Sequence, residues 1–471
     1  MKPAVGPSCS DRRSFYENSA ADRELASKRY YHRLLERYYR FLVPPGLRVL
    51  EIGCGFGNLL AALKPSHGVG LEFAKSIAER ARILHPELEI HHAAAGEFSS
   101  SEKFDYIILS DLANDLSDVQ ATLEWLRPFA TPHTRVVLNA FNYGWRPILT
   151  LLERLGLKSP SLPQNWLSAD DMRNLLHLAG WELVKQESHI LCPTNIPLFG
   201  ELLNRWIAPL FPSFCLALFQ VARLKPLIRA DAQYSCSVVI PARNESGNIE
   251  AAVRRVPEMG KGTEIILIEG HSSDQTWEEI QRVKAAHSNR NIKILKQQST
   301  GKGGAVREAF AAANGDILFI LDADLTVAPE ELPKFYEAVR SGSAEFVNGV
   351  RLVYPMQEEA MPFLNMLANQ TFGRLFSWLL GQPTKDTLCG TKVLFREDYL
   401  EIARHRAYFG DFDPFGDFDL LFGAAKLNLK IVDLPIRYQA RTYGETNIHR
   451  WRHGLLLLRM VLFAARRIKF I

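Results

Sequence analysis

Cysteine is scarce in this sequence, and its few cysteines lie far apart. No two of the six form a Cys-x-x-Cys pair; they are Cys9, Cys54, Cys192, Cys215, Cys236 and Cys389. This spacing argues against a zinc site and against a disulfide scaffold. It is typical of a reducing compartment, so we expect a cytoplasmic protein.

A surplus of charge of one sign is also missing. Lysine and arginine number 56 and aspartate and glutamate 52, which leaves a net charge of +4 for 471 residues. So small a surplus gives no argument for nucleic acid, and we predict no nucleic-acid partner. A hydrophobic share of 47% and a charged share of 23% exclude a disordered chain and a long coiled coil. At about 100–200 residues a domain, the length predicts two or three domains.

No hydrophobic run is long enough to predict a membrane span with ease. The first 20 residues lack the apolar core of a secretory signal. A span needs about 20 apolar residues. The best candidate, residues 206–222, is shorter and contains Pro209 and Pro212. We therefore expect a re-entrant or surface-lying segment there.

Both halves of the chain alternate predicted strands with predicted helices, which indicates an α/β fold with parallel sheets. In the first half we expect strands at residues 48–52, 68–72, 89–92, 106–110, 135–139 and 182–188. The second half restarts the pattern at residues 236–240, 264–268, 293–295 and 317–321. We predict a first domain over residues 1–230 and a second over 231–471. The first has its core at 25–190 and an apolar connector at 191–230.

A glycine-rich loop follows the first predicted strand. Gly53, Gly55 and Gly57 come directly after an apolar strand and before a helix. Glycine lets a backbone turn sharply and approach a ligand closely. A dinucleotide fingerprint Gly-x-Gly-x-x-Gly needs glycine at position 58, which is Asn58 here. The spacing therefore differs from that fingerprint.

Two acids and a later strand accompany this loop. Glu51 completes the pattern Glu-x-Gly-x-Gly-x-Gly, which resembles class I S-adenosylmethionine-dependent methyltransferases. Glu72 ends the next predicted strand, where an acid can accept hydrogen bonds from ribose hydroxyls. Residues 104–111 resemble the family's fourth strand. The resemblance implies a Rossmann-like sheet that holds S-adenosylmethionine through Glu51, Gly53, Gly55, Gly57, Glu72 and Asp111.

The loop 94–97 departs from that family. An acid near the adenine amino group is common there, and this chain has Ala95. Two readings stay open: the domain transfers a methyl group by positioning an acceptor, or it is a non-catalytic binding or scaffolding module. Side chains that could face an acceptor are Tyr30, Tyr31, His32, Asn139 and Asn142.

In the second half, a buried strand at residues 317–321 leads into Asp322-Ala323-Asp324. Residues i and i+2 of a strand point the same way, so we expect both carboxylates on one side. Such a pair can hold Mg²⁺ or Mn²⁺ against a diphosphate. The metal offsets the charge that grows on a leaving nucleoside diphosphate. We therefore predict a metal site at Asp322 and Asp324.

Three other segments join this one in a fixed order: residues 238–245, 269–276 and 301–307. The last combines backbone amides at the start of a helix with basic side chains, which suits an anionic diphosphate. The set resembles family 2 glycosyltransferases of the GT-A fold, over nearly all of residues 236–450. Gly270 departs from the family, because it replaces the second acid of the base-recognising pair. The resemblance implies a nucleotide sugar held by Pro241, Ala242, Asn244, Glu245, Glu269, Asp274, Lys302, Arg307, Asp322, Ala323, Asp324, Arg351 and Lys392.

Later segments are most similar to the dolichyl- and polyprenyl-phosphate sugar transferases of that family. Residues 386–392 resemble its Asp-x-x-Cys-Gly-x-Lys segment, residues 416–421 its acidic pair near the acceptor, and residues 441–447 a phosphate loop in which Asn447 replaces lysine. Inverting transfer to a lipid-linked or glycan acceptor is implied. A phosphate acceptor is already ionised and needs little help from a base, whereas a sugar hydroxyl needs more. The implied catalytic residues are Asp322, Asp324, Asp417, Asp419 and Arg441, with an acceptor loop of Asp386, Arg441, Gly444 and Thr446.

Residues 446–471 form a basic tail without a single acid. Arg452, Arg459 and Arg466 are seven apart and would line one face of a helix whose other faces are largely apolar. Such a helix suits an anionic membrane surface. The alternative is a helix docked on its own protein, with the arginine stems lying along the surface. We predict a peripheral protein on the inner face of a membrane; the sequence leaves its oligomeric state open.

Overall fold

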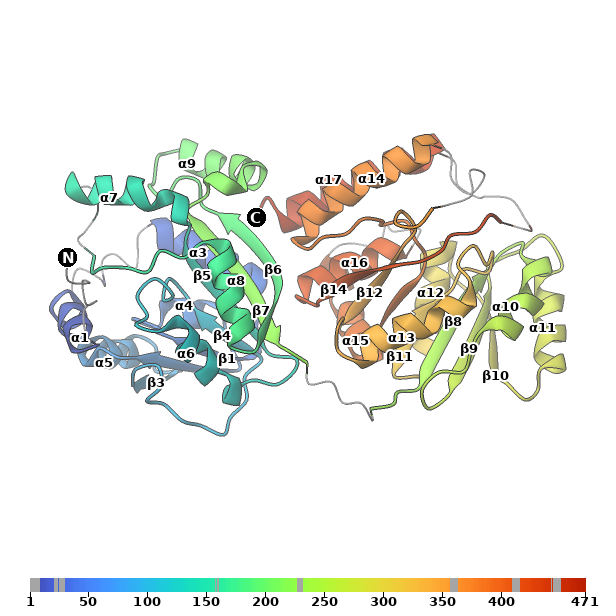
Figure 1. The fold of residues 1–471 in the computed structure, drawn as a ribbon, viewed down its shortest axis with the longest axis horizontal. Coiled ribbons are helices and arrows are strands. Elements are labelled where there is room, and N and C mark those ends of the chain that lie inside the picture. The colour runs from blue at the N-terminus through green and yellow to red at the C-terminus, as the bar shows by residue number, and fades with distance from the viewer. Residues whose placement is uncertain are drawn as a thin grey trace. The chain divides into compact units, whose positions relative to one another are not determined.

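A computed structural model gives the structure of the chain (Figure 1). It describes residues 9–20, 24, 30–156, 158, 161–226, 232–355, 363–408, 416–441, 443 and 450–471. The chain divides into two compact units. The first comprises Met1–Lys225 with Lys469–Ile471, and the second comprises Pro226–Ile468. Both units are α/β, as the sequence predicts.

The first unit contains a seven-stranded sheet in the order β3-β2-β1-β4-β5-β7-β6. Strands β1 to β5 run parallel, and β7 is antiparallel to both of its neighbours. The strands are β1 (Arg48–Ile52), β2 (His67–Glu72), β3 (Glu89–His92), β4 (Tyr106–Leu109), β5 (Arg135–Phe141), β6 (Trp181–His189) and β7 (Ala217–Leu224).

Strand β7 corrects the predicted connector at 191–230, and it places residues 217–222 of the surface-lying segment predicted at 206–222 inside the sheet. Its residues are buried almost from end to end and pair on both sides. Phe219 and Val221 pack into the apolar cluster on one face of the sheet, and Ala222 into the cluster on the other. A strand buried on both faces is apolar throughout and lacks an alternating pattern. For that reason this strand resembled a membrane-seeking segment.

Helices cover both faces of this sheet (Figure 1). Leu34, Leu35, Tyr38 and Tyr39 of α3 pack into one cluster, and Leu123 of α6 with Leu176 of α8 into the other. Helix α8 begins at Ser168, as predicted, with a capping box to Asp171. The helices are α1 (Cys9–Asn18), α3 (Tyr30–Leu42), α4 (Asn58–Ala62), α5 (Lys75–Leu84), α6 (Val119–Trp125), α7 (Arg146–Arg154), α8 (Ala169–Leu178) and α9 (Phe199–Leu202), with short helical turns η1 (Arg127–Phe129), η2 (Tyr143–Trp145), η3 (Leu203–Ile207), η4 (Ala208–Leu210) and η5 (Pro212–Phe214).

The second unit also contains a seven-stranded sheet, in the order β10-β9-β8-β11-β13-β12-β14. Strands β8 to β11 are parallel, β13 runs antiparallel between β11 and β12, and β14 is parallel to β12. The strands are β8 (Cys236–Ala242), β9 (Thr263–Glu269), β10 (Asn291–Lys296), β11 (Ile317–Ile320), β12 (Phe346–Val350), β13 (Lys392–Phe395) and β14 (Ile431–Pro435).

Helices of the second unit enclose this sheet, and its largest core cluster includes Val253 of α10, Ile280 of α11 and Phe335 of α13. The helices are α10 (Ile249–Arg255), α11 (Thr276–Ala286), α12 (Gly301–Ala312), α13 (Leu332–Arg340), α14 (Phe363–Leu380), α15 (Arg396–Arg404), α16 (Asp417–Lys426) and α17 (Arg450–Ile468), with turns η6 (Ser246–Asn248), η7 (Pro329–Glu331) and η8 (Arg406–Tyr408).

The C-terminal helix α17 has two faces. One is buried and includes Leu457, Met460 and Ala464, and the helix contacts α14. The opposite face leaves large apolar side chains exposed, at Leu455, Leu458 and Leu462. The tail predicted at 446–471 does not belong to one unit. Its last residues, Lys469–Ile471, belong to the first unit, where Lys469 forms a buried ion pair with Glu187 of β6. Within the part of the chain that the structure describes, no helix has the length and apolar content of a membrane span.

Candidate functional site

The glycine loop of the first unit turns sharply out of β1. Gly53, Gly55 and Gly57 have φ of 70°, 53° and 75°, in the left-handed region that favours glycine. A Cβ added to Gly55 would meet no heavy atom of the described residues within 4 Å. The loop therefore leaves open space beside Gly55, which a ligand could occupy.

Two buried carboxylates lie beside this loop. Glu72 accepts hydrogen bonds from the backbone N–H of Gly55 (3.0 Å) and of Ala74 (2.9 Å). Burial raises the pKa of Glu51 to about 8, against a hydrogen bond from the Leu60 backbone that lowers it. Among the described residues, Glu51 Oε2 has no hydrogen-bond partner. The cradle thus combines open backbone with acids, which fits a ligand that carries hydroxyl donors and positive charge, as S-adenosylmethionine does.

Asp111 lies in a separate cluster at the end of β4. Its Oδ1 accepts hydrogen bonds from Tyr31 Oη (3.0 Å) and from Asn139 Nδ2. Asn139 Oδ1 in turn accepts from Tyr39 Oη (2.7 Å). Burial raises the pKa of Asp111 to about 6 although both hydrogen bonds lower it. Two predicted acceptor-facing residues, Tyr31 and Asn139, therefore meet Asp111; Tyr39 was missed, and no sequence signal marked it.

Helix α1 adds residues that sequence reasoning missed altogether. Tyr16 packs edge-on against Phe73, with ring centroids 5.2 Å apart, and donates to Asp115 Oδ2 (2.5 Å). Glu17 accepts from Ser76 N–H (3.1 Å) at the start of α5. These contacts place α1 next to the residue that follows Glu72. The predicted core began at residue 25, so α1 fell outside it.

In the second unit, the loops after β8 and β9 leave the same edge of the sheet, since Ala242 pairs with Glu269. Asn244 Oδ1 accepts from Ser273 N–H (2.8 Å), which ties the two loops together. Asp274 accepts from Thr276 N–H (3.0 Å). Burial would raise the pKa of Asp274, but hydrogen bonds to Thr276 and Ser246 outweigh it and lower that pKa. The residues predicted for the nucleoside pocket are therefore neighbours.

Asp322 and Asp324 lie beyond β11, which ends at Ile320. The strand alternation used to align the two carboxylates therefore does not apply, and each meets a different cation. Asp322 Oδ1 lies 2.6 Å from Lys302 Nζ, and Asp324 Oδ2 lies 2.6 Å from Arg441 Nη2. Burial would raise the pKa of Asp322, but the charges of Lys302, Lys392 and Arg351 lower it.

Further cations surround this pair. Arg351 holds Asp386 through two hydrogen bonds of 2.7 and 2.9 Å. Arg441 also donates to Glu245 Oε1 (3.0 Å). Lys392 is buried and donates to the carbonyl oxygen of Cys389. These cations meet an equal number of carboxylates, so the edge suits an anion that arrives together with a cation of its own.

Gly390 fits tightly against the carboxylate pair. A Cβ at this position would lie 2.1 Å from Asp322 Oδ2 and 2.5 Å from Lys302 Nζ. The backbone of the predicted polyprenyl-phosphate segment therefore touches the metal-binding candidate directly. The family resemblance assigns roles to Asp386 and Lys392 of this segment, and none to Gly390.

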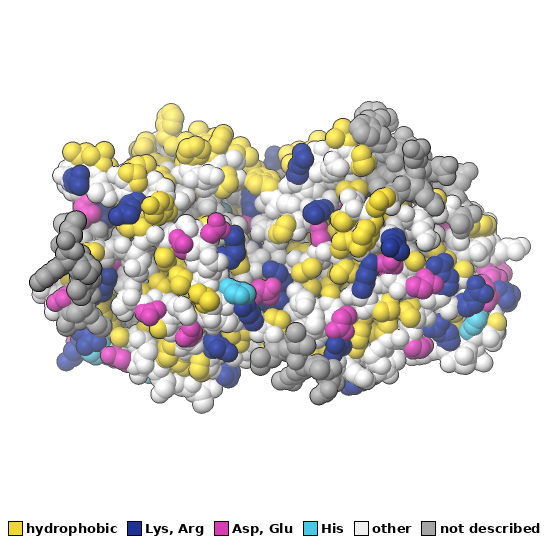
Figure 2. All heavy atoms as spheres, viewed as in Figure 1, with side chains coloured by type: hydrophobic (Ala, Val, Ile, Leu, Met, Phe, Trp, Pro, Cys, Tyr) yellow, Lys and Arg dark blue, Asp and Glu magenta, His cyan; other side chains and the backbone are white. Residues whose placement is uncertain are grey.

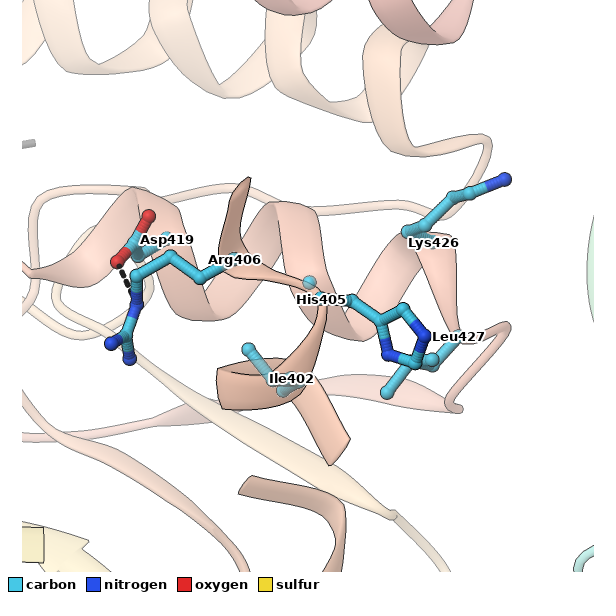
Figure 3. Close-up of a pocket in the computed structure, with 7 residues that line it drawn as sticks. Ile402, His405, Arg406, Asp419, Lys426 and Leu427 are labelled. Carbon is cyan, nitrogen blue, oxygen red and sulfur yellow. Dashed lines mark ion pairs between the residues drawn. The ribbon is translucent and has the colours of Figure 1, made fainter. Parts of the chain in front are cut away.

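Asp419 does not face an open site. Its carboxylate lies 3.0 Å from Arg406 Nε and 3.4 Å from Arg307 Nη1, and burial raises its pKa. Figure 3 shows Asp419 and Arg406 at one end of a small pocket that His405 and Leu427 also line. Its volume of about 10 Å³ holds one water at most, so it is no substrate pocket. The side chain of Asp417 and residues Gly444 and Thr446 lie outside the described residues.

The donor set at Asp322 and Asp324 is compatible with a metal only in part. Among the described residues, no group of three or more His, Cys, Asp or Glu side chains could hold an ion. Mg²⁺ is nevertheless commonly bound through one or two carboxylates together with substrate phosphates. Two protein carboxylates beside an anion-binding edge satisfy that pattern.

The two sheets, each with its glycine loop at the carboxyl ends of parallel strands, define two ligand-binding α/β domains of the doubly wound type. Residues 237–402 match the family model of glycosyl transferase family 2, and residues 21–186 match that of a methyltransferase domain. Both resemblances that the motifs predicted are therefore confirmed, and both matches are to transferases.

Individual relatives match the second unit. Dolichol-phosphate mannosyltransferase of Pyrococcus furiosus is 29% identical over 219 residues, covering 45% of this chain and 58% of that protein. Undecaprenyl-phosphate 4-deoxy-4-formamido-L-arabinose transferase of Edwardsiella ictaluri is 25% identical over 226 residues, covering 47% of this chain and 64% of that protein. The chain thus spans less than two thirds of the length of either relative. The structure of glucosyl-3-phosphoglycerate synthase from Mycobacterium tuberculosis is 18% identical, with a TM-score of 0.37, and covers 51% of this chain and 82% of that one.

Proposed function

We propose that the second unit transfers a sugar, with inversion, from a nucleotide sugar to a polyprenyl phosphate or another lipid or glycan acceptor. The observation that carries the proposal is the half-buried Asp322–Asp324 pair set among Lys302, Arg351 and Arg441. Both relatives named above act, by name, on dolichol phosphate or undecaprenyl phosphate. The same class of acceptor is the first to test here.

Asp322 and Asp324 would hold a divalent metal. A bound divalent cation supplies positive charge against the departing nucleoside diphosphate. With Asp322 and Asp324 holding a metal, Lys302 and Arg441 would be available to neutralise diphosphate oxygens. Burial would raise the pKa of Asp386, but Arg351 lowers it, so Asp386 would stay ionised where the acceptor is proposed to bind. A phosphate acceptor attacks as an anion, so this site needs no strong base.

For the first unit we propose S-adenosylmethionine as cofactor and methyl transfer as activity. The cofactor supplies the methyl group. The side chains of Glu51 and Glu72 and the backbone of Gly55 would hold the cofactor. A hydroxyl or amine acceptor loses a proton as it takes the methyl group, and Asp111, which accepts hydrogen bonds from Tyr31 and Asn139, would receive that proton. The second candidate is a non-catalytic binding or scaffolding module. Ala95 favours it, because the family commonly has an acid near the adenine amino group at this position.

We further propose that the protein is cytoplasmic and peripheral on the inner face of a membrane. The exposed Leu455, Leu458 and Leu462 of α17 would enter the interface, while Arg459 and Arg466 meet anionic headgroups. Each arginine near such a surface contributes about 1 kcal/mol. Changing Arg452, Arg459 and Arg466 to glutamate should therefore remove the salt-sensitive part of sedimentation with anionic vesicles at low salt. Unchanged sedimentation would make α17 a packing helix only.

The experiment that tests the glycosyl transfer is a donor screen. The full chain is incubated with a panel of radiolabelled nucleotide sugars, with and without polyprenyl phosphate, in Mg²⁺, Mn²⁺ or excess chelator. We expect label in the lipid extract only when metal, polyprenyl phosphate and the correct donor are all present. Equal transfer in excess chelator would contradict the metal site, and transfer only to water-soluble glycan would contradict the lipid acceptor.

A further inference from the structure

The first unit carries a dense set of exposed apolar side chains between β6 and β7. This segment passes through α9 and the turns η3, η4 and η5, and prolines interrupt it repeatedly. Figure 2 shows hydrophobic side chains gathered over α7 and α9 at the top of this unit. Leu198 is 90% exposed and Phe214 67% exposed. The other large apolar side chains exposed in the segment are Ile196, Phe199, Leu202, Trp206, Leu210 and Phe211.

Helix α7 extends this surface. Its Ile148 and Leu151 are exposed, as is Leu155 directly after it. Trp145, directly before α7, donates through Nε1 to the carbonyl oxygen of Phe214 (2.8 Å), which fixes the helix to η5. We call α7 together with residues 196–214 the apolar ridge. Contiguous apolar surface beyond a few hundred Å² is rare on monomers and marks an interaction site.

The ridge has a well-packed inner side, so its outer side chains are not exposed through poor packing. Asn204 is fully buried and bonds the backbone of Cys192 twice, at 2.7 and 2.8 Å. It also reaches Tyr30 Oη at 3.2 Å. Ala208 and Cys215 are completely buried. The fold therefore holds the backbone firmly and presents leucine and phenylalanine outward.

Charge around the ridge is mostly positive, and the acid of α7, Glu153, is paired with Lys158 at 3.5 Å. Arg146, Arg154 and Arg205 are exposed on it or at its edge. Residues 202–225 contain no aspartate or glutamate. Glu201 is the one acid between residues 196 and 214, and it is paired with Arg37 at 2.7 Å. A cationic border around leucine, phenylalanine and tryptophan complements an anionic lipid surface.

We propose that the apolar ridge inserts into the headgroup and acyl boundary of an anionic bilayer, as a membrane contact of the first unit that is separate from α17. A bilayer matches the outward side chains better than a protein partner does, because they are mostly aliphatic and phenyl groups without hydrogen-bonding atoms. Protein interfaces of the non-obligate kind carry many direct hydrogen bonds. Insertion through apolar groups is also insensitive to salt, whereas attraction through arginine is screened.

The test compares ridge and control variants of the full chain on sucrose-loaded vesicles of phosphatidylcholine and phosphatidylglycerol at about 0.5 M salt. The ridge variant carries Leu198→Asp, Phe199→Asp and Phe214→Asp. The control carries Ile83→Asp and Leu178→Asp, which are 71% and 63% exposed on α5 and α8 of the same unit. We expect the ridge variant to lose about tenfold or more of its vesicle partition, and the control to match wild type. The variant with Arg452, Arg459 and Arg466 changed to glutamate should still bind vesicles at this salt, because the ridge does not depend on those arginines. This result distinguishes the ridge proposal from the proposal on α17.

Equal partition of ridge variant and wild type, or an equal loss in the control, would overturn the proposal. A ridge variant that only dissociates a dimer, with vesicle binding intact, would also overturn it and make the ridge an interface between copies. A second measurement needs no aspartate: brominated lipids should quench wild-type tryptophan fluorescence, and Trp206→Phe should remove part of that quenching. Quenching that is absent, or that Trp206→Phe leaves unchanged, contradicts insertion.

Discussion

The two glycine loops share a strand–loop–helix geometry but face different side chains: acids at the first loop, and acids paired with cations at the second. Gly55 lies beside the buried carboxylates of Glu51 and Glu72. The loop that begins α12 presents Lys302 to Asp322, with Arg351 and further cations around it. The first environment favours a ligand with positive charge and hydroxyl donors, and the second favours a diphosphate. The backbone thus sets where a ligand binds, while side chains from neighbouring strands decide its charge.

The glycines themselves also differ in purpose. A Cβ at Gly55 would point into space that no described atom fills, so glycine is needed there for a ligand. A Cβ at Gly304 would lie 2.1 Å from Ser299 Oγ, and one at Gly390 equally close to Asp322. In the second unit glycine is needed for protein packing around the site. Glycine therefore indicates space for a ligand at the first loop and close protein packing at the second.

The sharpest way to break the comparison is to remove a carboxylate from the cationic site. Asp324→Ala should lower kcat for glycosyl transfer by about 10³ or more, equivalent to about 4 kcal/mol, because the metal loses a ligand. S-adenosylmethionine affinity should stay unchanged. Glu337→Gln, an exposed acid of the same unit, serves as control and should keep full activity. An Asp324→Ala protein with wild-type turnover would show that no metal acts there.

The second largest effect is expected at the acidic loop. Gly55→Val should reduce S-adenosylmethionine binding by at least about 100-fold, since the side chain fills the cradle and glycine's φ of 53° disfavours it. Gly46 has φ of 79° and equally open surroundings, so Gly46→Val carries similar backbone strain away from the loop. Calorimetric titration with S-adenosylmethionine compares the affinities of the two variants. A Gly46→Val protein that loses binding equally would mean that strain alone is responsible.

A third prediction concerns pH and the burial of Glu51. Its pKa of about 8 lies above its usual 4.5, so the folded chain holds a proton that the unfolded chain releases. The free energy of unfolding of the first unit should therefore fall as pH rises from 4.5 to about 8, and then level off. Glu51→Gln should remove this slope and stabilise the unit by about 4 kcal/mol at pH 8. Thermal unfolding across a pH series measures this pH dependence. If the slope persists in Glu51→Gln, another titrating group causes it.

The smallest expected effect comes from the acid that bonds the loop. Glu72→Gln should weaken S-adenosylmethionine binding by about 1–2 kcal/mol, because an amide offers one acceptor oxygen in place of two charged ones. Nucleotide binding by the second unit should not change. Unaltered affinity in this variant would limit Glu72 to holding the loop, and would leave the ribose contact to another residue.

Much of this arrangement follows from the sequence, and the exceptions have physical reasons. The loops at Gly53–Gly57 and Lys302 were predictable because a glycine-rich stretch between a strand and a helix is a local pattern. Strand β7 was not predictable in this way, since a strand buried on both faces has no periodicity. The separate partners of Asp322 and Asp324 depend on where β11 ends, which pattern alone does not fix. The contact of Lys469 with Glu187 joins residues 282 positions apart.

One calorimetric experiment tests the central claim, that one chain carries two separate ligand sites with different side chains. Wild type, Gly55→Val and Asp324→Ala are each titrated with S-adenosylmethionine and, separately, with uridine or guanosine diphosphate and Mn²⁺. The account predicts that wild type binds both kinds of ligand, that Gly55→Val loses only S-adenosylmethionine, and that Asp324→Ala loses only the metal-dependent nucleotide. Loss of both ligands in either variant, or failure of wild type to bind either one, would contradict it.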